Sequence, residues 1–269
     1  SKKLDIRQSN VDLKGIDCII HLAALSNDPM GALNEKLTQD INFKATIKLA
    51  KMAKKIGVKR FIFSSSCAVY GIANETVVNE KFKINPLTAY AKSKAMVEKE
   101  LKKLKSDNFC ICLLRNATVY GFSPRFRNDL VVNNLVTCGL ALGEIRVLSD
   151  GTPWRPLIDV RDLCDIFMKF IEVDSKRVNG EIFNIGFSES NYQIKDILTI
   201  IKKYLPRCTI VFTGEHGKDA RSYKVNFTKL KKLFPEIKQK WPLKKSILDL
   251  IERLSKNKFK KEDFEQGKF

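Results

Sequence analysis

The sequence is poor in the residues that build metal sites and disulfide frameworks. It has only 2 histidines, His21 and His216, and they lie far apart in the chain. Its 7 cysteines are odd in number, include no Cys-x-x-Cys pair and mostly lie within apolar runs. These absences argue against a zinc centre and a disulfide framework, and they indicate reduced core thiols. We therefore expect no metal.

Long apolar runs are also missing. No stretch approaches the roughly 20 apolar residues that cross a bilayer, and the first residues lack the pattern of a signal peptide. We expect a cytoplasmic protein that has no membrane partner. With 269 residues, 44% of them hydrophobic, the chain is long enough to bury one large core or two lobes.

Acidic residues are outnumbered by basic ones. The 49 Lys and Arg against 30 Asp and Glu give a formal net charge of +19. A nucleic-acid partner would explain such an excess. The lysines, however, are spread along helix-like segments, as at Lys48, Lys51, Lys54 and Lys55, and no basic segment is rich in aromatic residues. We favour a solvated, lysine-rich surface over a nucleic-acid groove, and a small basic site for a diphosphate fits either interpretation.

Short apolar segments alternate with amphipathic ones in the first half of the chain. Strands are expected at 16–24, 60–66 and 109–115, and helices at 36–56 and 86–104. This alternation predicts an α/β fold with a doubly wound parallel sheet. Such sheets bind ligands in the crevice at the carboxyl ends of their strands.

After Gly121 the regular alternation of strands and helices gives way to a less regular mixture of the two. Helices are expected at 128–142, 162–173, 194–205, 227–234 and 243–254, strands at 144–148, 181–186 and 209–212, and a turn at 149–153. We expect this half to cap the crevice, and the charged tail from Lys256 to fray.

Tyr90 and Lys94 form a Tyr-x-x-x-Lys motif near the start of a predicted helix. The i, i+4 spacing puts both side chains on one face. A free tyrosine, with a pKa of about 10, is a poor base, but a nearby ammonium or a positively charged nicotinamide lowers that pKa. The tyrosinate can then take a proton from a sugar hydroxyl while hydride leaves the carbon, and Ser66 could hydrogen-bond the same hydroxyl. Spacing alone is weak evidence, because such a pair is usually a half-buried ring beside a solvated amine.

The context of this motif resembles a known family. The segments that carry the resemblance run almost from end to end: Asp5-Ile6-Arg7, His21-Leu22-Ala23-Ala24, Asn42, the Ser-rich stretch from Phe63 to Gly71, Tyr90 with Lys94, Leu114 to Gly121, Asp150 to Ile158, and Glu181 to Gly186. The sequence is similar to the extended short-chain dehydrogenase/reductases, specifically the NAD-dependent sugar-nucleotide epimerase/dehydratase family, and is UDP-glucose 4-epimerase-like.

The resemblance implies a Rossmann-like doubly wound parallel sheet with a smaller mixed α/β substrate-binding lobe. Residues 1–121 would form a partial NAD(P)-binding domain. Residues 122–269 would form mostly the substrate-binding lobe, with 157–186 returning to the Rossmann domain.

The resemblance also implies the site residues. Its catalytic residues would be Ser66, Tyr90 and Lys94. Its cofactor-binding residues would be Asp5, Ile6, Leu22, Ala23, Ala24, Asn42, Ser64, Ser65, Tyr90, Lys94 and Asn116. Its substrate-binding residues would be Ser66, Thr118, Arg155 and Arg221, the two arginines on the nucleotide diphosphate.

Each of these assignments has a structural alternative. Arg155 could be a surface ion-pair partner, although its place after a Gly-Thr-Pro turn favours a rigid phosphate clamp. Arg221 could equally be an ordinary surface residue. Asn42 could be a solvated helix residue, Ala23 and Ala24 could be core packing, and His21 is expected to be packed rather than catalytic.

One departure from the family pattern concerns the cofactor. The family begins with a strand, a glycine-rich turn and a helix that hold the pyrophosphate, and the expected G-x-x-G-x-x-G is not matched here. About 50–60 residues, the size of a βαβ unit, would be missing before Ser1. We therefore expect an N-terminally truncated chain that binds NAD poorly and is unstable or inactive in isolation. A cooperative thermal melt that NAD raises would contradict this.

A second departure concerns the reaction. Cys67 and Ala68 stand where sugar-nucleotide 4,6-dehydratases carry an Asp-Glu pair, so water elimination is disfavoured. A 4-epimerase, which oxidises C4 with NAD and returns the hydride to the other face, is the leading interpretation. A 4-ketoreductase or decarboxylase is the alternative, and a non-catalytic NAD- or RNA-binding relative is a remote one. Thr118 and Asp159 replace residues common in epimerases, which leaves the sugar open.

The expected cofactor is NAD, and the sequence does not distinguish it from NADP. A nucleotide-diphosphate sugar is the expected ligand, with the nucleotide and sugar both open. The resemblance also implies a homodimer, because family members often pack two helices, here 36–56 and 86–104, into a four-helix bundle.

Overall fold

The computed structural model describes residues 4–8, 11–26, 32–73, 77–214, 222–256 and 262. The chain divides into two compact units. Unit 1 comprises Ser1–Gly71, Glu80–Asn116 and Phe167–Asn184, and unit 2 comprises Ile72–Asn79, Ala117–Ile166 and Ile185–Phe269. These boundaries differ from the expected ones: residues 117–121 belong to unit 2, and the returning segment is 167–184 instead of 157–186.

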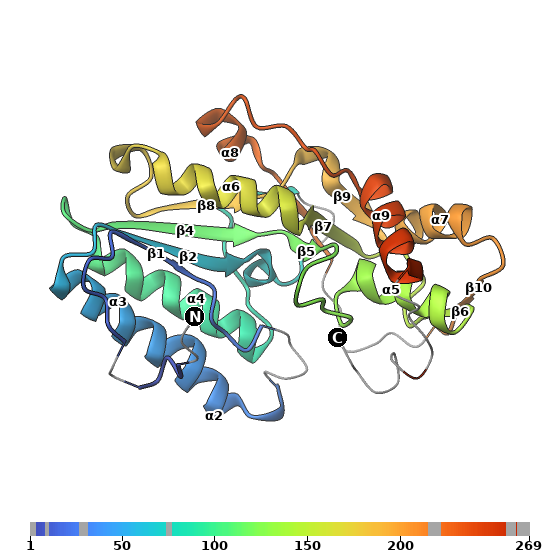
Figure 1. Ribbon diagram of the computed structural model, residues 1–269, viewed down its shortest axis with the longest axis horizontal. Coiled ribbons are helices and arrows are strands. Elements are labelled where there is room, and N and C mark those ends of the chain that lie inside the picture. The colour runs from blue at the N-terminus through green and yellow to red at the C-terminus, as the bar shows by residue number, and fades with distance from the viewer. Residues whose placement is uncertain are drawn as a thin grey trace. The chain divides into compact units, whose positions relative to one another are not determined.

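A four-stranded sheet forms the centre of unit 1, with the strand order β1-β2-β4-β8 (Figure 1). Its strands are β1 (Cys18–His21), β2 (Arg60–Ser66), β4 (Cys110–Asn116) and β8 (Glu181–Ile185). The first three pair in parallel, with Cys18 opposite Arg60 and Arg60 opposite Cys110. The sequence order of these neighbours requires crossover connections, which confirms the predicted α/β class with a parallel sheet.

Helices cover both faces of this sheet (Figure 1). One face carries a continuous run made of α2 (Glu35–Thr38), a π-helical segment (Gln39–Ala45) and α3 (Thr46–Ile56), together with α4 (Ala89–Leu104). The other face is covered by the part of α6 (Val160–Glu172) that follows Ile166.

The helix ends follow from local sequence. Gly57 takes the left-handed conformation, with φ 94°, and ends α3 where a Cβ would be strained. The Thr88 side chain accepts a hydrogen bond from Ala91 N and caps α4. Pro86 therefore stays outside the helix, which begins at Ala89 instead of the expected Pro86.

Alternate residues of the central strands build the core beneath α3 and α4. Phe61 and Phe63 of β2 and Ile111 and Leu113 of β4 are buried there. On the opposite face the Arg60 guanidinium donates to the backbone oxygens of Phe170, Ile171 and Val173. This cation satisfies carbonyls at the end of α6 that have no partner within the helix.

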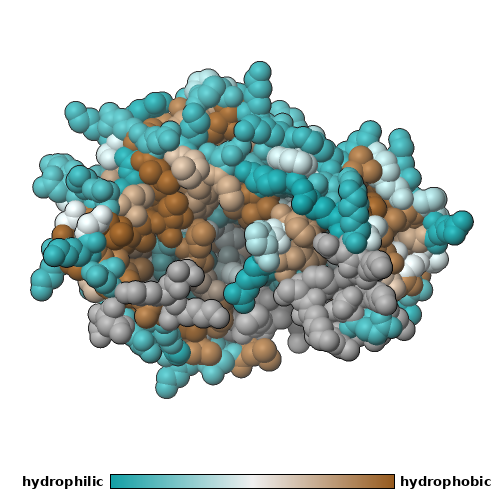
Figure 2. Space-filling view, in the orientation of Figure 1, coloured by the Kyte–Doolittle hydropathy of each residue, from teal (hydrophilic) through white to brown (hydrophobic). Residues whose placement is uncertain are grey.

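β1 is the edge strand, and it spans only Cys18–His21 instead of the expected 16–24. Among the described strands its neighbour is β2, and its ladder begins where β2 begins, at the Cys18–Arg60 pair. Cys18, Ile19 and Ile20 are only half-buried. In the view of Figure 2, hydrophobic side chains gather on the left, over β1 and β2.

Unit 2 is built from small sheets and helices. Its strands are β3 (Val77–Val78), β5 (Thr118–Tyr120), β6 (Glu144–Val147), β7 (Trp154–Asp159), β9 (Asn191–Gln193), β10 (Thr209–Phe212) and β11 (Lys224–Val225), paired as β5-β7-β9, β6-β10 and β3-β11. Its remaining helices are α5 (Val131–Ala141), α7 (Ile194–Tyr204), α8 (Thr228–Leu233) and α9 (Leu243–Lys256). Helices α5, α7 and α9 share one apolar core. In the part of the chain that the structure describes, no helix has the length and apolarity to cross a bilayer.

Candidate active site

The carboxyl ends of β2 and β4 bring several predicted site residues together in unit 1. Ser66 and Asn116 are register partners at the last rung that the two strands share. Asn116 Nδ2 donates to Ser64 Oγ over 2.9 Å. The other end of this amide, Asn116 Oδ1, is buried and has no partner among the described residues. A buried acceptor of this kind is usually satisfied by a water or a ligand donor.

Lys94 brings a positive charge to the same strand ends. Its side chain is 3% exposed, and its Nζ donates to Ser64 O over 2.6 Å. Nζ lies 4.7 Å from the Phe63 ring centroid and 5.7 Å from the Tyr90 ring centroid. Burial lowers the pKa of Lys94 to about 8, and the Glu98 carboxylate opposes this shift. The lysine is therefore a cation held close to a phenol ring with little water around it.

Ser66 ends β2 and caps the short helix that follows. Its Oγ accepts a hydrogen bond from Ala68 N over 3.1 Å. Because the hydroxyl acts as the acceptor in this bond, its proton can still be donated to another oxygen. The side chain is half-buried, so a ligand could reach it.

The loop after β1 contains Leu22, Ala23 and Ala24, and Asn42 holds its far end. Asn42 Oδ1 accepts from Leu25 N over 2.8 Å, and Asn42 Nδ2 donates to Leu25 O over 3.0 Å. Nδ2 also donates to Ser93 Oγ over 3.1 Å. Both ends of this buried amide are thus bonded within the protein. Asn42 therefore holds this loop in place, and its predicted contact with the cofactor stays a prediction.

His21 is packed in the core of unit 1, in agreement with its expected role. Its ring stacks near Phe63, and its Nε2 lies 2.8 Å from Thr46 Oγ1. Since Thr46 Oγ1 donates its proton to Asn42 O, the imidazole Nε2 must be the donor to Thr46. Burial is the main reason why the pKa of His21 falls from 6.5 to about 4, and the Lys94 charge adds to this effect.

The lowered pKa of His21 predicts acid sensitivity of the fold. The unfolded chain binds a proton at His21 below pH 6.5, whereas the folded chain does so only near pH 4. Stability is thus fully present above pH 6.5 and is lost as the pH falls from 6.5 through 4, by on the order of 3 kcal/mol. Chemical denaturation at several pH values would measure this slope in the native protein and in His21→Gln. Equal slopes in both would contradict the prediction, because carboxylates titrate in both.

Asp5 and Ile6 lie in a turn of unit 1 near the start of the described chain. The Asp5 carboxylate accepts from the Arg7 backbone amide over 3.0 Å and from its guanidinium. These bonds lower the pKa of Asp5 to about 2. Ile6 is half-buried. Their predicted contact with the cofactor stays a prediction.

Apart from Ser66, the predicted substrate-binding residues belong to unit 2. Thr118 is in β5, opposite Leu157 of β7, and Arg155 is in β7 itself. The Arg155 side chain is half-buried, and its Nη1 donates to Trp154 O over 3.0 Å. Arg221 lies outside the described residues.

Asp159 has a structural role within unit 2. Its side chain is fully buried, and it accepts hydrogen bonds from Arg161 N, the Arg161 guanidinium and Ser246 Oγ. A Cβ on Gly121, whose φ is 107°, would come within 2.7 Å of Asp159 Oδ2. With its carboxylate committed in this way, Asp159 is unsuited to direct contact with a sugar.

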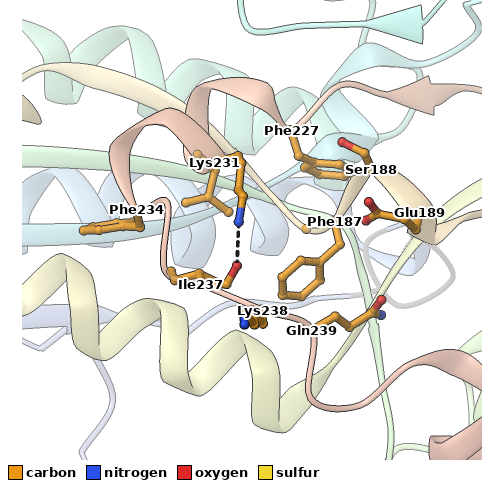
Figure 3. A pocket seen from close by; sticks show the side chains of 11 residues that line it. Phe187, Ser188, Glu189, Phe227, Lys231, Phe234, Ile237, Lys238 and Gln239 are labelled. Atoms are coloured by element: carbon orange, nitrogen blue, oxygen red, sulfur yellow. Dashed lines mark hydrogen bonds between the residues drawn. The ribbon is translucent and has the colours of Figure 1, made fainter.

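Unit 2 also holds a half-open pocket of about 340 Å³ (Figure 3). The rings of Phe187, Phe227 and Phe234 line it, with Lys231 donating to Ile237 O over 3.2 Å. None of the predicted site residues that the structure describes lines this pocket.

A buried charged pair beside the strand ends was not foreseen from the sequence. Glu98 of α4 and Arg115 of β4 are each 3% exposed and form a salt bridge of 2.7 Å. The available signal was the position of Glu98, four residues after Lys94 on the same helix. An arginine within the otherwise apolar run 109–115 was the second signal.

The chain matches the family model described as the NAD dependent epimerase/dehydratase family over residues 3–186. The chain belongs to this family. It is 28% identical over 210 residues to the UDP-glucose 4-epimerase of Bacillus subtilis (strain 168), covering 70% of this chain and 60% of that protein. It is 25% identical over 283 residues to UDP-glucose 4-epimerase 1 of Oryza sativa subsp. japonica, covering 96% of this chain and 80% of that protein.

A solved structure is similar over most of the chain. It is the UDP-glucuronic acid 4-epimerase from Bacillus cereus in complex with UDP-glucuronic acid and NAD. Its TM-score is 0.82 at 25% identity, covering 94% of this chain and 81% of that chain. The family match confirms the predicted resemblance to NAD-dependent enzymes, and this likeness confirms the Rossmann-like fold class. The homodimer and the cytoplasmic location stay predictions.

Proposed function

We propose that the protein is an NAD-dependent 4-epimerase of a nucleotide-diphosphate sugar. One observation carries the proposal: the buried Lys94 ammonium lies beside the Tyr90 ring, 5.7 Å from its centroid, at the carboxyl end of the strand that ends in Ser66. A buried cation beside a phenol favours the phenolate, which is the form that can act as a base. The names of the curated relatives support the same reaction.

In this mechanism Tyr90, as phenolate, removes the proton from the C4 hydroxyl of the sugar. Ser66 donates its hydroxyl proton in a hydrogen bond to the same oxygen. The NAD, when bound, supplies the acceptor and later the donor of the hydride. After the keto-sugar has rotated, Tyr90 returns the proton to the C4 oxygen. Throughout, Lys94 keeps the phenolate form of Tyr90 accessible near neutral pH.

The described residues fit such a cofactor. The Lys94 ammonium uses one proton on Ser64 O and has two more for hydroxyl groups of the nicotinamide ribose. Asn116 Oδ1 offers a buried acceptor next to Ser64 and Ser65. The loop 22–24, fastened by Asn42 through Leu25, would pass the phosphates, and Asp5 with Ile6 would border the adenine.

The residues after Ser66 favour epimerisation over dehydration. Cys67 is 1% exposed, and its Sγ lies 3.2 Å from Arg115 O, to which the thiol donates. Burial raises the pKa of the Cys67 thiol far above neutrality. Ala68 has no ionisable group. Neither residue can supply the acid and base that water elimination requires.

A cofactor-free assay tests the proposal. Purified enzyme that keeps NAD bound should interconvert UDP-glucose and UDP-galactose without added cofactor, because the bound NAD would accept the hydride and return it in each cycle. Separation of the two sugar nucleotides by chromatography measures the reaction, and Arg155→Ala should raise KM if Arg155 holds the diphosphate. Net consumption of NADPH would instead indicate a reductase. Salt-dependent RNA binding without any turnover would indicate the non-catalytic alternative.

A further inference from the structure

Glu98 is the hub of a buried polar network in unit 1. Its Oε2 accepts from Arg115 Nη2 over 2.7 Å, and its Oε1 accepts from Arg115 Nε over 3.0 Å. Oε1 also accepts from Ser65 Oγ over 2.6 Å. Three side chains from α4, β4 and β2 therefore meet at one carboxylate.

The network lies one residue before the candidate site on each strand. Ser65 and Arg115 face each other as register partners of β2 and β4, and the next rung is Ser66 with Asn116. Glu98 thus binds both members of the rung that precedes the predicted catalytic serine. The carboxylate fixes where α4 stands relative to these two strand ends.

On the helix side, Glu98 follows Lys94 by four residues and Tyr90 by eight. Residues at this spacing lie along one face of a helix. Any slide or rotation of α4 that breaks the bonds of Glu98 would also move Tyr90 and Lys94 against Ser66. The network therefore has the geometry to set the distances on which proton transfer depends.

The charges around Lys94 give Glu98 a second role. Among the described residues, Glu98 of α4 and His21 of β1 interact electrostatically with the Lys94 ammonium, and the Tyr90 ring of α4 lies 5.7 Å from it. His21 is neutral above pH 4 because of its lowered pKa, so Glu98 is the nearby anion that favours the protonated lysine. Arg115 of β4 is bound to Glu98 and balances its charge.

The far end of the network is also fastened. Arg115 Nη1 donates to Tyr70 OH over 3.1 Å, and Tyr70 OH donates to Asn184 Oδ1 over 2.7 Å. Asn184 N in turn donates to Glu80 Oε1 over 2.9 Å. This chain limits the freedom of the Arg115 guanidinium, which makes the pair a rigid support.

We propose that Glu98 is a positioning residue of the active site: through Ser65 and Arg115 it holds α4 in register with the ends of β2 and β4, and so it holds Lys94 and Tyr90 in place beside Ser66. The proposal deepens the proposed function and rests on Tyr90 as the base. A purely structural ion pair could be replaced at little cost by apolar residues, so stability alone does not require charges here.

The test combines Glu98→Gln with a direct measurement of Tyr90. The near-ultraviolet absorbance of tyrosinate is titrated with and without Tyr90→Phe in the same background, and the difference isolates Tyr90. In Glu98→Gln the midpoint should rise by about one pH unit, because a Lys94 that is displaced from the Tyr90 ring stabilises the phenolate less. The kcat should fall by about 10- to 100-fold, with KM changed by less than about twofold.

Three further variants keep the test decisive. Glu98→Asp retains the charge and should restore part of the Tyr90 midpoint shift. Ser65→Ala removes one hydroxyl without stranding a charge, so it should fold even if Glu98→Gln does not, and lower kcat by about fivefold. Glu100→Gln, the same change at a half-buried glutamate of α4 that pairs with Lys103, should leave kcat and the midpoint as in the native protein.

The outcomes separate this inference from the proposed function. A raised Tyr90 midpoint in Glu98→Gln supports the inference even if UDP-glucose is not turned over, in which case the proposed reaction fails alone. Turnover of UDP-glucose with an unchanged midpoint and kcat in folded Glu98→Gln overturns the inference and leaves the reaction standing. If Glu98→Gln does not fold, unchanged kcat and midpoint in Ser65→Ala overturn it.

Discussion

Tyr90→Phe should lower kcat for sugar-nucleotide epimerisation by about 10²- to 10⁴-fold, the range that general acid-base catalysis contributes. Phenylalanine keeps the ring and its contact with the Lys94 ammonium, and it removes only the hydroxyl that takes and returns the proton. The melting temperature and the affinity for the substrate should stay close to the native values. Steady-state kinetics and a thermal melt of the same sample measure both.

Tyr204→Phe provides the matched control, because it makes the same change in α7 of unit 2. It should retain the native kcat. A Tyr90→Phe protein that keeps more than about a tenth of native kcat would exclude Tyr90 as the base.

Lys94→Met should remove activity and make the fold more stable. The ammonium is 3% exposed, and burial lowers the pKa of Lys94 from 10.5 to about 8, so the folded state carries a charge that is poorly solvated. That shift corresponds to a penalty on the order of 3 kcal/mol at neutral pH, offset by about 1–2 kcal/mol for the lost bond to Ser64 O. A net gain of about 1–2 kcal/mol is expected in the free energy of unfolding, with kcat lowered at least about 100-fold.

The difference in stability between Lys94→Met and the native protein should depend on pH in a defined direction. Between pH 8 and 10.5 the unfolded chain binds a proton at residue 94 that the folded chain does not. The free energy of unfolding of the native protein therefore rises with pH in this window. The stability advantage of Lys94→Met should be largest below pH 8 and should reverse in sign before pH 10.5, because only the loss of the bond to Ser64 O then remains. Denaturant melts at several pH values measure the difference. Lys99→Met, an exposed lysine of the same helix, is the control and should show no such trend.

Much of unit 1 could be predicted because its strands are buried on both faces. The run Arg60–Ser66 reads as a strand from its apolar residues, and the structure has a strand with the same bounds. The run 36–56 was expected to be one regular helix, but Gln39–Ala45 is π-helical. Such a bulge depends on packing that no local propensity encodes.

Unit 2 was harder to predict because its strands are short and contain turn residues. A turn was expected at 149–153 and no strand directly after it, yet Trp154–Asp159 forms β7, paired with β5 and β9. Pairing with strands that lie far away in the sequence decides such a segment.

The difference between local and long-range contacts also explains which site residues the sequence predicted and which it missed. Tyr90 and Lys94 are neighbours through helix spacing alone, so the sequence contains their relation. The contact of Glu98 with Arg115 and Ser65 arises only when α4 packs on the sheet, across 17 and 33 positions of the chain. The role of Asn42 on Leu25 is of this second kind as well.

The two hydrogen bonds between Asn42 and the Leu25 backbone have a consequence for hydrogen exchange. Leu25 lies in a loop, outside any ladder, where amide protons normally exchange with solvent within the fastest class. Its amide is nevertheless bonded to a buried carboxamide oxygen at 2.8 Å. The Leu25 amide should therefore exchange far more slowly than that of the neighbouring Ala24, and its rate would time each opening of the loop that borders the candidate cofactor site.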